Sequence, residues 1–212
     1  MIASTGLAST SVAVVVTVVA GYLLGSIPVA VLVARARGVD VRRVGDRNPG
    51  YWNAKEALGR RAALPVFAGD VAKGSAAAAV GVVLGGPWWV GYLGGAAAMI
   101  GHAWPVFAGF RGGRSLLTFV GAMLVLAPLP SAIAIVVCMV VSLITRSFAI
   151  GARVGVFGLP VIQAFFEPRS HVAATGALMS IIGLRFGMAA WEARRPVPDQ
   201  PVPDQLGPDQ TG

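Results

Sequence analysis

The sequence predicts an all-α integral membrane protein, a bundle of about seven short transmembrane helices with motif-bearing loops on the cytoplasmic side. Of the 212 residues, 56% are hydrophobic and 12% are charged, whereas a soluble domain carries roughly 25% charged residues. Apolar runs near the ~20 residues that a bilayer requires recur along the chain. The composition argues against a water-soluble enzyme, a disordered regulator and a free nucleic-acid-binding module.

The apolar segments predict where the membrane-spanning helices lie along the chain. The first covers residues 12–34 and lacks the basic start and small-residue cleavage site of a signal peptide. The run over residues 116–145 contains Pro128 and Pro130, and because proline interrupts helical hydrogen bonding we expect two short spans joined by a tight turn. Five spans are the alternative if short segments are re-entrant. The other expected spans cover residues 62–84, 88–107, 148–166 and 172–191.

The basic residues predict the orientation of these helices. If the loop over residues 35–61 lies in the cytoplasm, alternation of the spans places 15 of the 17 Lys and Arg residues on that side or at its edge. Only Arg169 lies outside, and Lys73 lies within a span. The positive-inside rule therefore favours an odd number of spans, a cytoplasmic C-terminus and a multi-pass protein of the inner (plasma) membrane.

The chain divides into a membrane domain over residues 1–195 and a tail over residues 196–212. The tail repeats the unit PDQ three times without apolar periodicity, which is typical of a disordered, extended segment. The single cysteine, Cys138, lies in an apolar run, so no internal disulfide can form. We expect no cofactor and no metal, and a monomer that contacts membrane lipids but no nucleic acid.

Polar residues that lipid would reject indicate where the chemistry lies. The first such segment, residues 38–53, reads GVDVRRVGDRNPGYWN and combines glycines, amides and arginines. Glycine turns can direct N–H groups at an anion, and arginine adds bidentate phosphate contacts. A solvated basic loop that only fixes orientation is the alternative interpretation.

Asp70 and Lys73 follow on a predicted helix, three residues apart and therefore on one face. They form either an internal ion pair or a phosphate contact that Asp70 orients. A second polar segment, residues 101–114, reads GHAWPVFAGFRGGR and places Gly112 and Gly113 between two arginines, a plausible phosphate-binding turn. His102 lies near the interface, and we weigh a structural hydrogen bond against a role as a base. His171 is expected on the opposite side, so a histidine metal site is not predicted.

At these motifs the chain resembles the acyl-phosphate:glycerol-3-phosphate acyltransferases of bacterial membranes, the PlsY family. Its first motif, roughly G-x-D-x-R-x-x-G-S-G-N-x-G-A-T-N followed by D-x-x-K-G, matches here at Gly38, Asp40, Arg42, Gly45, Asn48, Gly50, Asn53, Asp70, Lys73 and Gly74. Gly25, Ser26 and Pro28 resemble its upstream start. Its second motif, G-H-x-x-P-x-F-x-x-F-x-G-G-K-G, matches at Gly101, His102, Pro105, Phe107, Phe110, Gly112 and Gly113.

The resemblance implies seven spans, a cytoplasmic site and transfer of an acyl group from acyl phosphate to the sn-1 hydroxyl of glycerol 3-phosphate. Lysophosphatidate and phosphate are the implied products, with no cofactor. Three residues are the implied catalytic set: Asn48, Asn53 and His102. The implied phosphate-binding residues are Arg42, Arg43, Lys73, Gly112, Gly113 and Arg114. Ser26, Asp70 and Arg146 are further site candidates, with Arg146 in place of the arginine of a third motif.

The motifs also contain substitutions. Asp46 and Arg47 replace a serine and a glycine, Tyr51 and Trp52 replace an alanine and a threonine, and Arg114 replaces a lysine. A carboxylate at position 46 repels a dianion unless Arg47 or Arg43 neutralises it. The second hypothesis is therefore a catalytically degenerate paralogue that binds a phosphorylated lipid precursor or uses another acceptor. A small transporter is a third possibility, but the apolar spans show neither a repeat nor a symmetric pair of interrupted helices.

Overall fold

The computed structural model describes residues 3–194, and helices are the only regular elements in this part of the chain. The predicted all-α class is confirmed. The predicted tail over residues 196–212 lies outside the described residues. In chain order the elements are α1 (Ala3–Gly25), α2 (Val29–Arg35), α3 (Tyr51–Leu58), α4 (Arg60–Val83), α5 (Trp89–Ala103), the 3-10 helix η1 (Val106–Ala108), α6 (Leu116–Leu126), α7 (Pro128–Thr145), α8 (Phe148–Gln163) and α9 (Arg169–Ala193).

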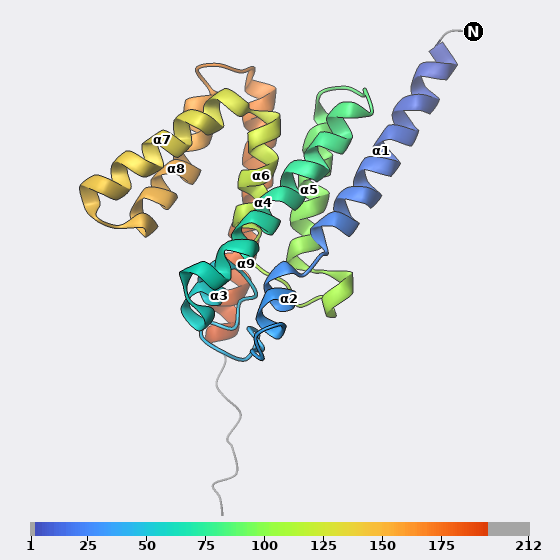
Figure 1. The fold of residues 1–212 in the computed structure, drawn as a ribbon. Coiled ribbons are helices and arrows are strands. Elements are labelled where there is room, and N and C mark those ends of the chain that lie inside the picture. Colours follow the sequence, from blue (N-terminus) through green and yellow to red (C-terminus); the bar gives the residue numbers. More distant parts are fainter. Residues whose placement is uncertain (1–2, 195–212) are drawn as a thin grey trace, which may run out of the picture.

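Four helical stretches of the described chain are long and apolar enough to cross a membrane, judged by length and composition. They are Thr10–Arg35, Arg60–Val83, Pro128–Thr145 and Arg169–Glu192. Helices α5, α6 and α8 are shorter, with 15, 11 and 16 residues. Figure 1 shows α1, α4, α5, α6 and α9 running alternately between the two ends of the bundle, while α7 and α8 leave it and return as a hairpin. Whether every short helix crosses completely stays a prediction.

The first predicted span is not one continuous helix. It divides into α1 and α2 at Ser26, Ile27 and Pro28. Pro28 has no N–H to donate and restricts the residue before it, so the chain leaves the helical path there. The break exposes backbone groups within the membrane domain, where they require partners from elsewhere in the protein.

The predicted division of residues 116–145 is confirmed. Helix α6 ends at Leu126 and α7 begins at Pro128, so Ala127 alone joins them. Pro128 occupies the first turn of α7, where its missing N–H removes no helical hydrogen bond. The Met123 carbonyl at the end of α6 accepts two hydrogen bonds, from the Ala127 N–H at 2.9 Å and from the Ser131 hydroxyl of α7 at 2.8 Å.

Small residues allow the helices to pack at close range. A Cβ atom on Gly25 of α1 would collide with the backbone of Ala98 in α5, and one on Gly74 of α4 would collide with Thr118 in α6. Such contacts are typical of membrane helices, where close backbone approach supplies much of the packing. They fix α1 against α5 and α4 against α6.

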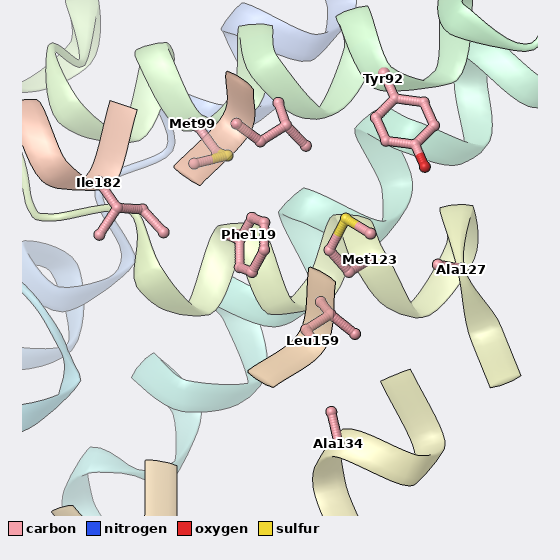
Figure 2. Packing of buried hydrophobic residues seen from close by; sticks show 9 residues of the cluster. Tyr92, Met99, Phe119, Met123, Ala127, Ala134, Leu159 and Ile182 are labelled. Atoms are coloured by element: carbon pink, nitrogen blue, oxygen red, sulfur yellow. The ribbon is translucent and has the colours of Figure 1, made fainter. Parts of the chain in front are cut away.

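Two apolar clusters support the bundle. In the first, Figure 2 shows Phe119 of α6 between Met99 of α5, Met123 and Leu159 of α8. The second cluster lies at the other side of the bundle and joins α2, the first motif loop, α3 and α4. Its buried members are Ala30, Val31, Ala34, Val41, Ala54, Ala63 and Val66. The first motif loop therefore has its own apolar anchor.

Helices α7 and α8 form a hairpin that packs mainly on itself and leans away from the bundle (Figure 1). Leu143 and Ile144 at its end are 79% and 77% exposed, as expected of lipid-facing side chains. Near that end, the rings of Phe148 and Trp52 of α3 lie 5.6 Å apart between centroids. This contact joins the hairpin to the first motif.

Candidate functional site

A pocket opens where α1 breaks into α2. The break contributes Gly25 and residues 27–31 to its wall, α4 contributes Asp70 and Lys73, and α5 contributes His102. The two motif loops complete it with Pro49, Pro105, Arg111, Gly112 and Gly113. Figure 1 shows both loops at the same end of the bundle, together with the end of α9.

Three buried polar side chains form the inner wall of the pocket. Lys73 Nζ lies 2.9 Å from Asp70 Oδ1, and His102 Nδ1 lies 3.4 Å from the same oxygen. These side chains are 3 to 7% exposed. Because a buried charge is costly without a partner, Asp70 compensates Lys73. Lys73 also donates a 3.1 Å hydrogen bond to the Ile27 carbonyl, so it caps the helix break.

The first motif loop is shaped by its own ion pair. Arg42 donates two hydrogen bonds to Asp40, at 3.0 and 3.2 Å, and its backbone N–H donates a third. The side-chain hydrogen bond from Arg42 lowers the pKa of Asp40 to about 2. Arg43 lies 3.6 Å from the same carboxylate but is 86% exposed. Asp40 thus holds Arg42 in one orientation, while the Arg43 side chain extends into the surroundings of the loop.

Asn53 lies inside this loop. Its amide nitrogen donates to the carbonyls of Val41 at 2.7 Å and Val44 at 3.0 Å, and the residue is 1% exposed. Gly45, with a positive φ of 56°, packs so closely on Asn53 that a side chain there would collide with it. The geometry thus gives Asn53 a positioning contact with the loop. Its predicted catalytic role is not tested.

The second motif loop folds back on the end of α5. The N–H of Gly112 donates to the Ala103 carbonyl at 3.2 Å, and that of Gly113 donates to the His102 carbonyl at 3.0 Å. Both N–H groups thus have backbone partners here, and phosphate binding at these two glycines stays a prediction. The glycines still line the pocket, and Gly113 packs against the His102 ring, which leaves no room for a side chain.

Arg185 of α9 holds the second loop from the other side. Its guanidinium donates to the carbonyls of Gly113 at 3.2 Å and Gly112 at 3.0 Å. The same group lies over the ring of Trp104 at 5.1 Å. The only indication of this contact in the sequence is that Arg185 is a basic residue within an apolar segment.

An ion pair joins the two motif loops. Arg114 Nη1 lies 3.0 Å from Asp46 Oδ2, and the side chains are 28% and 43% exposed. The second oxygen of Asp46 accepts the backbone N–H of Asn48 at 3.1 Å. The expected partners of Asp46, Arg43 and Arg47, are therefore corrected to Arg114 of the other motif, which the fold brings next to the carboxylate.

The predicted site residues fall into three groups. Asp70, Lys73, His102, Gly112 and Gly113 line one pocket. Arg42, Arg43, Asn48 and Arg114 lie on the loops that border it without lining it. Ser26 is fully buried at the helix break, and its hydroxyl has no hydrogen-bond partner among residues 3–194. Arg146 is exposed at the turn between α7 and α8, outside the pocket lining.

Sequence reasoning missed Arg111 and Pro49 as lining residues and Arg185 as a support. Arg111 is one of the two arginines of the expected phosphate-binding turn, but it was not among the predicted site residues. Among residues 3–194 no group of three or more His, Cys, Asp or Glu side chains could hold a metal ion.

The glycerol-3-phosphate acyltransferase family model matches residues 15–192. This chain belongs to that family. It is 38% identical over 158 residues to glycerol-3-phosphate acyltransferase 5 of Dehalococcoides mccartyi, covering 74% of this chain and 67% of the relative. It is 46% identical over 115 residues to the Rubrobacter xylanophilus acyltransferase, covering 54% and 57%. The chain thus spans about two thirds or less of these relatives' lengths.

The fold of this acyltransferase family member is also that of a solved relative. The crystal structure of PlsY, an integral membrane glycerol 3-phosphate acyltransferase in its glycerol 3-phosphate form, superposes with a TM-score of 0.75 at 27% identity. The match covers 85% of this chain and 91% of that one. The predicted family, acyltransferase class and multi-pass membrane fold are confirmed.

Proposed function

We propose that this acyltransferase transfers the acyl group of an acyl phosphate to the sn-1 hydroxyl of glycerol 3-phosphate at the cytoplasmic face of the plasma membrane. The products are lysophosphatidate and phosphate. Membership of the family supports the acceptor and the acyl transfer. The observation that carries the proposal is the pocket in which buried Lys73, Asp70 and His102 meet both motif loops at the break of the first membrane helix.

The reaction requires the protein to position its two substrates more than to activate them. The hydroxyl oxygen attacks the acyl carbonyl carbon, and the bond between that carbon and the phosphate oxygen breaks. The hydroxyl proton leaves with the released phosphate. Acyl phosphate is already an activated donor, so neither a protein nucleophile nor a metal is needed. A site that holds two anionic substrates close together and stabilises the developing oxyanion can accelerate this reaction.

The residues of the site have distinct proposed roles. Lys73 provides the buried positive charge for a substrate phosphate, and Arg111 provides another at the pocket wall. Asp70 orients Lys73 and His102, since both contact the same carboxylate oxygen. Gly112 and Gly113 give the pocket its shape, and the remaining cations and amides border its entrance. These are Arg42, Arg43, Arg114 and Asn48.

The second substrate enters from the membrane. Exposed apolar side chains cover α1, α7 and α8, including Val15, Val136 and Phe157 at 60%, 53% and 64% exposure. Because such faces are compatible with lipid, the acyl chain can remain in the hydrocarbon region while its phosphate reaches the pocket. We propose that the protein acts as a monomer within the lipid.

The test is phosphate release from palmitoyl phosphate and glycerol 3-phosphate by the purified protein in detergent. We expect turnover that depends on both substrates and is lost in Arg111→Ala. The exposed Arg60→Ala variant removes the same charge from the start of α4 and should retain activity. A folded protein without turnover would refute the proposal and favour the degenerate paralogue that binds a phosphorylated lipid precursor.

A further inference from the structure

We infer that Asp46 and Arg114 form an interloop clasp, a pair of positioning residues that holds the two motif loops at the separation needed for substrate binding. The inference rests on the proposed function. The clasp consists of the 3.0 Å contact between Arg114 Nη1 and Asp46 Oδ2. It connects residues that lie far apart in the sequence and that both depart from the motif pattern the chain otherwise follows.

Each partner of the clasp is itself held in place. Asp46 Oδ1 accepts the N–H of Asn48, which fixes the carboxylate to its own loop. The Arg114 guanidinium lies over the ring of Phe186 in α9, 4.9 Å from its centroid. A planar guanidinium can stack on a ring and bind a carboxylate at the same time, whereas a lysine ammonium lacks the flat face for such stacking. Arginine at position 114 therefore suits an aspartate at position 46.

The clasp is placed to set the shape of the pocket. Pro49 follows Asp46 closely in the first loop, and Arg111, Gly112 and Gly113 directly precede Arg114 in the second. All four of these residues line the pocket. Arg185 holds Gly112 and Gly113 on the α9 side, so the clasp supplies the corresponding restraint on the side of the first loop.

The exposure of the clasp predicts a local effect. Partly exposed ion pairs contribute little to the stability of a whole fold, and these side chains are 28% and 43% exposed. Loss of the clasp should thus loosen the loops without unfolding the helices. The consequence should appear in substrate binding.

The experiment is a double-mutant cycle on the purified full chain with Asp46→Asn, Arg114→Gln and the double variant. We expect each single variant to raise the KM for glycerol 3-phosphate about two- to five-fold, the range such pairs support, with kcat within about twofold. The KM of the double variant should be no higher than that of the single variant with the higher KM. Glu56→Gln and Arg60→Gln are matched controls, because both residues are exposed near the same loop.

Three results would overturn the clasp. The effects of the two single variants could multiply in the double variant, which would show that the residues act independently. Asp46→Asn could lower KM, which would show that the carboxylate competes with substrate for Arg114. Either variant could lower the unfolding temperature of the protein together with the rise in KM. That result would indicate a general structural role.

A second measurement does not depend on catalysis. Hydrogen exchange should rise in residues 109–115 of Asp46→Asn and in residues 41–50 of Arg114→Gln, while both stay unchanged in the controls. If wild-type protein shows no turnover, the proposed function fails, and these exchange rates still decide the clasp. Unchanged exchange in the opposite loop of both variants would refute it.

Discussion

Lys73 and Asp70 are charged residues in a membrane helix, and each reduces the free-energy cost of burying the other. They lie 2.9 Å apart and are almost fully buried, and Lys73 also donates a hydrogen bond to the Ile27 carbonyl at the break of the first helix. One residue thus caps a broken helix and presents a positive charge to the pocket. The requirement for a buried counterion explains why Asp70 accompanies it.

This pairing predicts different outcomes for single and double substitutions. Lys73→Met leaves the Asp70 carboxylate buried without its cation and should destabilise the protein by about 3–5 kcal/mol. Asp70→Asn combined with Lys73→Met removes both charges and should restore most of that stability, yet remain inactive. Thermal unfolding in detergent and phosphate release measure the two properties. Activity in the double variant would contradict the assignment of Lys73 to a substrate phosphate.

Asp40 and Arg42 allow a prediction about pH. A carboxylate whose pKa falls on folding contributes stability above its ordinary value of 3.8 and loses that contribution as the pH drops through about 2. The pair should therefore be intact throughout the range from about pH 5 to 8. We expect Asp40→Asn to raise the KM for glycerol 3-phosphate by a factor that is constant over this range, measured with the phosphate-release assay. A factor that changes with pH would show that another titrating group controls Arg42.

At the scale of the helices, the break between α1 and α2 depends on the packing of α1 against α5. Gly25 precedes the break, and a Cβ atom there would collide with the backbone of Ala98. Gly25→Ala should therefore separate the two helices, with a loss of about 1–3 kcal/mol and reduced phosphate release. Gly187→Ala on α9 is the control, because nothing lies within 4 Å of the added atom. Equal unfolding temperatures in the two variants would contradict this account of the packing.

The helices were largely predictable because apolar run length and proline position determine them. Pro128 correctly divides α6 from α7. Pro28 has the same chemistry, but the apolar residues on both sides suggested one continuous span over residues 12–34. Counting apolar residues does not reveal that a buried lysine from another helix can satisfy the backbone at a break.

The site was predictable in its residues but not in its contacts. Lys73, His102, Gly112 and Gly113 follow from motif spacing and do line the pocket. The support from Arg185 and the pairing of Asp46 with Arg114 depend on which helices are neighbours in space, and a sequence pattern does not contain that information. The occupied N–H groups of Gly112 and Gly113 likewise follow from the fold of the loop onto the end of α5.

At the scale of the whole molecule, the arrangement of the loops links charge to function. Figure 1 shows the first motif loop, the second motif loop and the end of α9 at one end of the bundle, while the α4–α5 and α8–α9 connections lie at the other. The first end carries most of the basic residues. The phosphate-binding role that we propose for the pocket and the positive-inside rule therefore both predict that this end faces the cytoplasm.

The last prediction tests this orientation directly. A fluorescent-protein reporter fused after Trp191 should be fluorescent, because it remains in the cytoplasm, and alkaline phosphatase at the same position should be inactive. The same enzyme inserted at Gly85, in the opposite connection, should be active. Glycerol 3-phosphate is a charged cytoplasmic metabolite that does not cross lipid unaided. An active phosphatase after Trp191 would place the pocket on the side without substrate, and the proposed reaction would then be excluded.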